Sequence, residues 1–180
     1  MADPAAYPSE LVRDVTLADG RRVRVRPIRA DDAGRLVELY DRLSRHTAYQ
    51  RFFTIMKRLP PDWATLLASV DYQRRLALVA EAETPDGIQI IAVARYEPTE
   101  RADTVEVAFV VQDNWQGHGL GRRLLDDLLA AAEARGHPRF CAWVLGDNYR
   151  MLDLLTRFTR VESRTFESGV AEIIFARRRE

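Results

Sequence analysis

The sequence predicts a mixed α/β fold, in which helices pack on the faces of a single mixed sheet. Strand-like segments are joined by glycine-containing turns, and segments with apolar residues at helical spacing lie between them. The chain has 180 residues, of which 47% are hydrophobic, so it can bury a full core. These observations favour one globular domain, or at most two small ones.

The chain begins with a predicted hairpin. We expect residues 1–10 to form a flexible tail and residues 11–177 to form a single domain. The strand-like segments 11–17 and 21–28 flank Asp19-Gly20, a strong hairpin signal. Arginines alternate with valines in the second strand, and we interpret their row as a solvated strand face rather than a nucleic-acid site: Arg22, Arg24 and Arg26.

Helical segments follow the hairpin. Asp31 is expected to cap a helix that reaches about Leu43, and a second helical region is predicted over residues 46–57. A third, short helix is predicted over residues 63–70. Side chains of the second region could line an acceptor pocket, although core packing is the commoner role of such a stripe: Tyr49, Arg51 and Phe52.

The middle of the chain is predicted to supply three strands. Residues 75–83 and 88–96 read as a strand pair around the turn sequence at 84–87, Thr-Pro-Asp-Gly. Residues 104–111 form the next predicted strand, which is apolar at almost every position.

The last third of the chain alternates between helix and strand. Leucines at helical spacing begin at Leu120, and Gly136 is expected to end that helix. Residues 140–145 read as a short buried strand, and Asp147 or Asn148 is expected to cap the next helix. Two further strands close the predicted fold: 161–166 and 170–176.

Residues 105–123 carry the strongest functional signal. They are expected to run from a strand through a glycine-rich turn into a helix start, where free N–H groups and the helix dipole favour an anion. Arg122 and Arg123 then place two cations in the first turn of the helix, where the helix dipole disfavours positive charge unless a negative ligand binds there. Taken alone such a turn is as often purely structural, but this one is predicted to bind a polyphosphate. Three glycines remove the Cβ atoms that would keep a phosphate away: Gly117, Gly119 and Gly121.

This turn, in its context, resembles that of a known family. Residues 116–121, QGHGLG, resemble the Gln/Arg-x-x-Gly-x-Gly/Ala motif of the GNAT acyltransferase superfamily, and they lie between a strand and a helix as in that family. The similarity extends from about Leu11 to Ala176. The segments RPIRADDAGRL, LSRHTAYQRFF and VEVAFVVQDNWQGHGLG are most similar to the bacterial protein lysine acetyltransferases.

The resemblance implies a GNAT-like fold, with a mostly antiparallel central sheet whose strands splay at the acyl-CoA site. It implies acetyl-CoA as cosubstrate and a primary amine, such as a protein lysine, as acceptor. Backbone groups of Val110 and Val111 would hold the pantetheine arm, with the Val110 N–H facing the oxyanion. Asn148 would contact the cofactor, cap its helix, or do both. The pyrophosphate would lie against the N–H groups of one run of residues: Gln116, Gly117, His118, Gly119, Leu120, Gly121 and Arg122.

Glu106 is the candidate general base. It lies on a strand that is otherwise apolar on both faces, where desolvation raises the pKa of a carboxyl and suits it to accept a proton near neutral pH. A structural ion pair with an arginine, or exposure at a sheet edge, is the alternative role. The resemblance favours the base, because a protonated amine cannot attack a thioester until a proton is removed.

The expected general acid is missing. Many GNAT enzymes carry a tyrosine seven residues after the asparagine that begins the last core helix, but counting from Asn148 leads to Leu155. Tyr149 is near in sequence and is expected to point elsewhere. The thiolate of CoA would then leave unprotonated or take a proton from water. Thr159-Arg160 also replaces the Gly-Phe that usually ends this helix.

Composition excludes several classes of function. Lys+Arg and Asp+Glu both number 27, a balance that argues against a dedicated nucleic-acid binder. The single cysteine, Cys141, excludes an intrachain disulfide and is expected to be a core thiol, and the three histidines form no metal pattern. With no signal peptide and no apolar stretch of membrane-spanning length, we expect a cytoplasmic protein.

The leading hypothesis is an acetyl-CoA-dependent N-acetyltransferase acting on a primary amine. The alternatives are acetylation of a small amine and a non-catalytic acyl-CoA-binding module, which the missing tyrosine favours. The sequence is compatible with a homodimer but does not require one.

Overall fold

The strands of the protein lie in one sheet. A computed structural model describes residues 6–179. The eight strands of this part of the chain are β1 (Arg13–Thr16), β2 (Arg22–Pro27), β3 (Leu76–Thr84), β4 (Gly87–Pro98), β5 (Thr104–Val111), β6 (Arg139–Leu145), β7 (Thr159–Glu167) and β8 (Val170–Arg177).

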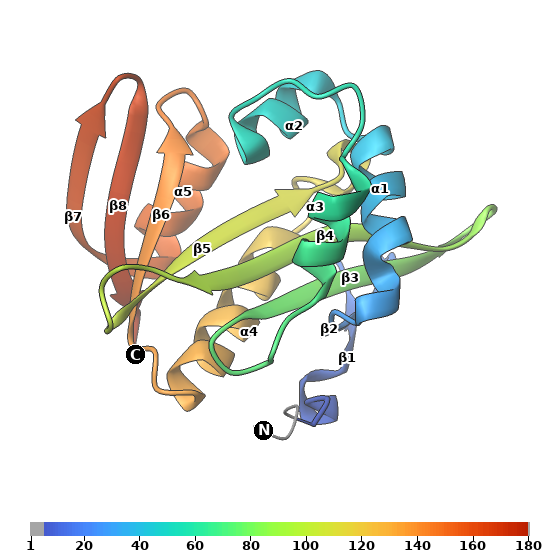
Figure 1. Cartoon of the computed structure of the whole chain (residues 1–180), viewed down its shortest axis with the longest axis horizontal. Helices are drawn as coiled ribbons and strands as arrows, with labels where there is room; N and C mark the ends of the chain where they lie inside the picture. Colours follow the sequence, from blue (N-terminus) through green and yellow to red (C-terminus); the bar gives the residue numbers. More distant parts are fainter. Residues whose placement is uncertain (1–5, 180) are drawn as a thin grey trace.

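The strand order is β1-β2-β3-β4-β5-β6-β8-β7 (Figure 1). Every neighbouring pair is antiparallel except β5 and β6, which run parallel. The β4–β5 ladder joins Ala92 to Val111 and runs to the pair Pro98–Val105. The predicted mixed, mostly antiparallel sheet is therefore confirmed.

Helices cover both faces of the sheet. The side chains of α1, α2 and α3 pack in one apolar cluster against one face, and those of α4 and α5 pack in a second cluster against the other (Figure 1). Short 3₁₀ turns precede β1 and α1 and follow β5. The helical elements are η1 (Ser9–Leu11), η2 (Ala30–Asp32), α1 (Ala33–Arg42), α2 (Arg45–Phe52), α3 (Pro61–Ala68), η3 (Asp113–Trp115), α4 (Leu120–Ala134) and α5 (Tyr149–Phe158).

The arginine row of β2 differs from the prediction at one position. Arg22 and Arg24 are exposed, as expected, whereas the Arg26 side chain is only 2% exposed. Its guanidinium donates hydrogen bonds of 2.8 Å to both carboxylate oxygens of Asp32 and one of 3.0 Å to Glu81. The turn η2 brings Asp32 against this end of β2, so a charge that the strand pattern places in solvent is buried and paired.

The helix boundaries also differ from the prediction in two places. Asp32, rather than Asp31, lies at the start of α1, and its carboxylate accepts the Arg29 N–H at 2.7 Å. The helix predicted over residues 46–57 ends at Phe52, because Phe53 adopts a left-handed conformation with φ of 58°. A left-handed residue after a helix is a common stop signal.

The predicted tail is shorter than expected. Residues 1–5 lie outside the described residues, but the Tyr7 hydroxyl donates a 2.7 Å hydrogen bond to the Pro27 carbonyl. The Tyr7 ring packs edge-on against Tyr72 at 5.6 Å. The prediction of a loose tail is therefore wrong from Tyr7 onward. None of the helices in the described residues combines the length and apolar composition needed to cross a bilayer.

Candidate active site

The central feature of the site is a gap between β5 and β6. These strands pair only from Thr104 to Glu106, opposite Arg139 to Cys141, and then separate (Figure 1). A groove of about 540 Å³ lies between the two strands, α2, the start of α4 and the length of α5. The predicted splaying of the strands is thus confirmed, and it leaves part of the β5 backbone without a β6 partner.

The glycine turn lies at one end of this groove. Gly117 and Gly119 have φ of 81° and 89°, a left-handed conformation that strains any other residue. In the part of the chain that the structure describes, the N–H groups of residues 117–122 donate no hydrogen bond to protein. Such a run of free donors at a helix start suits a phosphate anion. Gly121 has no such requirement, because a Cβ there meets only Leu154 Cδ2 at 3.8 Å.

Most of the predicted cofactor residues line the groove. His118 and Leu120 do not: the His118 Nδ1 lies 3.7 Å from an Asp19 oxygen, and Leu120 is buried in the core. Only their backbone N–H groups are available to a ligand. The predicted residues that line the groove are Val110, Val111, Gln116, Gly117, Gly119, Gly121, Arg122 and Asn148.

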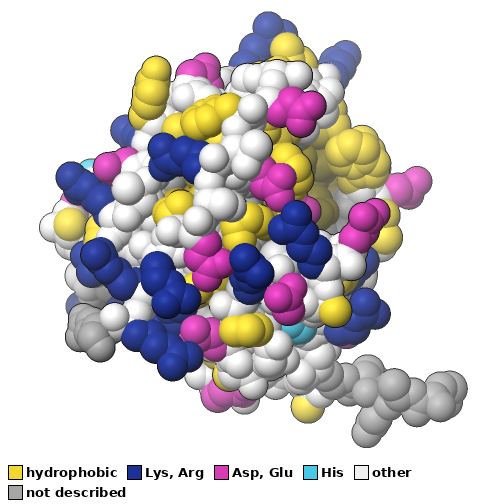
Figure 2. All heavy atoms as spheres, turned by 90° about the vertical axis from the view of Figure 1, so that its left-hand side faces the viewer, with side chains coloured by type: hydrophobic (Ala, Val, Ile, Leu, Met, Phe, Trp, Pro, Cys, Tyr) yellow, Lys and Arg dark blue, Asp and Glu magenta, His cyan; other side chains and the backbone are white. Residues whose placement is uncertain are grey.

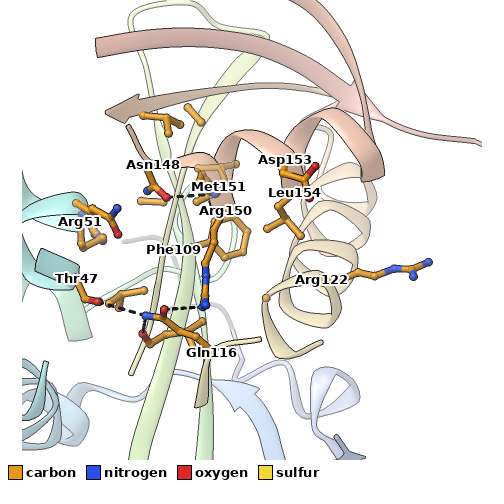
Figure 3. Close-up of a pocket in the computed structure, with 18 of the residues that line it drawn as sticks. Thr47, Arg51, Phe109, Gln116, Arg122, Asn148, Arg150, Met151, Asp153 and Leu154 are labelled. Carbon is orange, nitrogen blue, oxygen red and sulfur yellow. Dashed lines mark hydrogen bonds between the residues drawn. The ribbon is translucent and has the colours of Figure 1, made fainter. Parts of the chain in front are cut away.

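The two arginines at the start of α4 have different environments. Arg122 lines the groove, and its guanidinium stacks on the Phe158 ring at 4.2 Å. Arg123 does not line the groove, because it turns to Asp127, 3.4 Å away and one helical turn later. The expectation that both cations serve the polyphosphate is therefore not met for Arg123, and the Arg122 side chain borders the groove but extends away from the glycine turn (Figure 3).

Arg150 is a groove residue that the sequence analysis missed. It extends from α5 and donates a 2.8 Å hydrogen bond to Gln116 Oε1 (Figure 3). Gln116 in turn donates to the Val111 carbonyl at 2.8 Å and to the Thr47 hydroxyl at 3.3 Å. The signal for Arg150 was its position in the first turn of the helix that Asn148 caps by accepting the Met151 N–H at 3.3 Å.

The strand register corrects the expected backbone contacts. Gln112 N–H donates to the Ile91 carbonyl of β4 at 2.9 Å, in the same register as the rest of the β4–β5 ladder. N–H directions alternate along a strand, so the Val110 N–H also faces β4 and pairs with Val93. The N–H groups of Phe109 and Val111 face the gap beside β6. The oxyanion donor expected at Val110 is therefore placed better at Phe109.

Glu106 lies where β5 and β6 begin to separate. It is half-buried, two residues before Ala108, the nearest groove residue on its own face of β5. Within the described residues its carboxylate makes neither an ion pair nor a hydrogen bond, so the alternative role as a paired structural carboxylate is not observed. Burial raises the pKa of Glu106, the nearby Arg51 charge lowers it and Glu97 raises it, and the net pKa lies above its usual range.

Arg51 of α2 faces the groove (Figure 3), and its positive charge acts on Glu106. Burial, together with the charge of Arg95, lowers its pKa to about 10, and its guanidinium lies 4.7 Å from the Phe52 ring. Arg51 lines the groove, whereas Phe52 packs on Tyr40 at 5.6 Å in the core. Tyr49 is exposed and does not line the groove, so only Arg51 of the predicted stripe reaches it.

The usual position of the general acid is apolar and closed. Leu155 is fully buried in the core, and Tyr149 is 75% exposed at the start of α5. Thr159 ends the helix by donating its hydroxyl to the Leu155 carbonyl at 2.6 Å. The replacement of Gly-Phe by Thr159-Arg160 therefore creates a capping hydrogen bond, and neither residue supplies an acid to the groove.

Cys141 has the environment of a core thiol. It is buried, and burial together with the charges of Glu106 and Glu172 raises its pKa to about 11. A thiol with a raised pKa is a poor nucleophile at neutral pH. No group of histidine, cysteine and acidic side chains that could hold a metal occurs between residues 6 and 179.

Sequence and structure comparisons identify the family. The model of the acetyltransferase (GNAT) family matches residues 38–159. The chain belongs to the GNAT acetyltransferase family. The acetyltransferase PA5475 of Pseudomonas aeruginosa is 30% identical over 77% of this chain and 75% of its own length.

Two further relatives are named Pat. Acetyltransferase Pat of Mycolicibacterium smegmatis is 34% identical over 82% of this chain, which spans 44% of the length of that protein. The chain is also similar to the crystal structure of the GNAT domain of S. lividans PAT, with 38% identity and a TM-score of 0.83. The match spans 94% of this chain and 99% of the S. lividans chain. Membership of this family confirms the predicted enzyme class, an acetyltransferase that uses acetyl-CoA.

Proposed function

We propose that this GNAT protein acetylates a primary amine, with lysine side chains of proteins as the acceptor class and Glu106 as the general base. The observation that carries the proposal is a carboxylate with a raised pKa where β5 and β6 diverge, beside a groove that ends in backbone donors; among the described residues neither the carboxylate nor these donors have a partner. The resemblance of three sequence segments to the bacterial protein lysine acetyltransferases supports the acceptor class. We also propose that the protein is cytoplasmic.

The reaction follows from this arrangement. The diphosphate of acetyl-CoA binds the N–H groups of residues 117–122, and the pantetheine arm runs along the open backbone of β5 at Phe109 and Val111. Glu106 accepts a proton from the ammonium group, directly or through water, and the amine lone pair attacks the thioester carbon. The Phe109 N–H stabilises the oxyanion. The C–S bond then breaks, the acetylated nitrogen releases its second proton to water, and CoA leaves as a thiolate that takes up a proton from water.

Turnover of the Glu106→Gln variant tests the proposal. With acetyl-CoA and lysine peptides, we expect kcat to fall by about 10²–10⁴-fold, the usual contribution of a general base, while the Kd for acetyl-CoA is unchanged. Glu83→Gln, an exposed carboxyl of β3, is the matched control and should retain full activity. Unchanged turnover of Glu106→Gln would remove Glu106 from the mechanism.

A non-catalytic acyl-CoA-binding module is the second candidate, favoured by the buried Leu155 at the usual acid position. Thiol release from acetyl-CoA, measured with peptides and with small amines, separates the candidates. Binding of acetyl-CoA without thiol release for every acceptor would support the module. Release with small amines alone would move the acceptor class away from proteins.

A further inference from the structure

The face of the sheet beyond Glu106 carries an unassigned combination of side chains. Glu106 lies opposite Cys141 on β6, and Trp143 follows two residues later on the same face. Trp143 pairs in register with Glu172 on β8. Cross-strand partners share a face of the sheet, so these four side chains lie on the face opposite α4 and α5.

Trp143 is a large aromatic side chain that this face leaves half-exposed. It is 48% exposed and lines the groove beside Ala142 and Val144. Figure 2, which views the molecule from the side of β7 and β8, shows a recess with hydrophobic side chains, bordered by charged side chains of both signs. An exposed indole beside a catalytic groove can bind methylene groups or a cation through its ring face.

Glu172 provides a negative charge beside this indole. Between residues 6 and 179 its carboxylate has no ion-pair partner. Arg139 lies on the same face, but its guanidinium is 3.0 Å from Glu162 and 3.8 Å from Asp103. The nearest cation on β6 is therefore already neutralised. Glu106 on β5 and Glu172 on β8 lie on the two strands that flank β6, which carries Cys141.

The spacing of the two carboxylates sets the kind of acceptor. Glu106 and Glu172 are two strands and two residues apart, so strand geometry separates their Cα atoms by roughly 12 Å. Side chains on one face of a sheet stand roughly perpendicular to it, so we expect the two carboxylates to be about as far apart as their Cα atoms, too far for one ammonium group to contact both. This distance matches a reacting lysine and a second positive charge a residue or two away along an extended peptide.

We propose that Trp143 and Glu172 form the acceptor-binding surface of this enzyme and select a lysine with a neighbouring basic residue. The reacting ammonium approaches Glu106, its methylene chain packs on the Trp143 ring, and the neighbouring cation pairs with Glu172. This inference rests on the proposed lysine acetylation and adds the sequence context of the acceptor.

Kinetics with three matched peptides test it: a single lysine flanked by arginine, by glutamine or by glutamate. With wild-type protein we expect kcat/KM to be about tenfold higher for the arginine peptide than for the glutamine peptide, through the acceptor KM. Glu172→Gln should remove this preference without changing the Kd for acetyl-CoA. Glu172→Lys should reverse it in favour of the glutamate peptide, which a misfolded protein cannot do.

Trp143→Ala should raise the KM of all three peptides, whereas Trp63→Ala, at 46% exposure on α3, and Glu83→Gln should change none of them. Equal kcat/KM of wild-type protein for the three peptides would overturn the proposed acceptor surface. A preference for the arginine peptide that survives in Glu172→Gln would do the same, and in both cases the proposed lysine acetylation would still stand. If no peptide is acetylated by wild-type protein, the proposed function itself fails.

Discussion

Arg150 and Gln116 join the two walls of the groove: the guanidinium on α5 donates a 2.8 Å hydrogen bond to the amide oxygen in the glycine turn. The same Gln116 amide donates to the carbonyl of Val111, at the end of β5. The side chains that flank the free N–H groups are therefore already ordered by one another. An anion that binds those N–H groups meets the positive charge of Arg150 beside them.

Arg150→Ala should weaken acetyl-CoA binding. Loss of a charge-assisted contact to phosphate is expected to raise the Kd by roughly tenfold, and less at high salt because the contact is solvent-exposed. Isothermal titration calorimetry at two salt concentrations measures this effect. Arg22→Ala removes an exposed arginine of β2 and serves as the control. Equal affinities for the two variants would show that Arg150 is not a phosphate ligand.

Gly119→Ala should destabilise the protein and impair cofactor binding. Gly119 precedes α4 with φ of 89°, where an alanine costs about 1–2 kcal/mol of conformational energy. No neighbouring atom lies within 4 Å of a Cβ at this position, so the effect comes from the backbone and not from a clash. Gly34→Ala is the matched control, because Gly34 lies in α1 with open space around it and no positive φ. Chemical denaturation should show stabilisation for Gly34→Ala and destabilisation for Gly119→Ala.

Glu106→Gln should change the pH dependence of stability. The folded state raises the pKa of Glu106, so between the unfolded and folded pKa values the folded protein binds more protons, and its stability falls as the pH rises. The uncharged glutamine avoids this loss. The variant should therefore have a higher Tm than the wild type at neutral pH, and the difference in Tm should vanish below the usual carboxyl pKa of about 4.3. A variant less stable than wild type at neutral pH would contradict the desolvated environment of Glu106.

Asp32→Asn should be strongly destabilising, by about 3–5 kcal/mol, because it leaves the buried Arg26 guanidinium without its main partner. Burial disfavours the charged Asp32, but hydrogen bonds from Arg26 and the Arg29 N–H outweigh it and lower the pKa of Asp32. This stability is present above the unfolded pKa of about 3.9 and is lost as the pH falls through the folded value. Urea denaturation at pH 7 measures the free energy of unfolding of Asp32→Asn. The control is Asp14→Asn, because the exposed ion pair of Asp14 with Arg24 should contribute little to stability.

Local patterns in the chain were sufficient for the elements and for the cofactor end of the site. Strand β5 runs over the predicted residues 104–111, and the glycine turn leads into α4 at Leu120 as expected. Glycine at positive φ, a helix start and an apolar strand are determined by neighbours in sequence, so a short window is enough to recognise them. The same holds for Asn148, whose capping bond involves Met151 three residues later.

Contacts between distant segments determined the rest. Arg26 is buried because Asp32 and Glu81 meet it in the folded protein, although its strand pattern is that of its exposed neighbours Arg22 and Arg24. Similarly, the groove depends on where β5 and β6 cease to pair, and the pairing of Trp143 with Glu172 depends on the β6–β8 register. Register and strand order bring together residues that are far apart in sequence, and a one-residue shift would reverse the face of each side chain. Which charges are paired, and which backbone groups face the groove, is therefore decided by the assembled sheet.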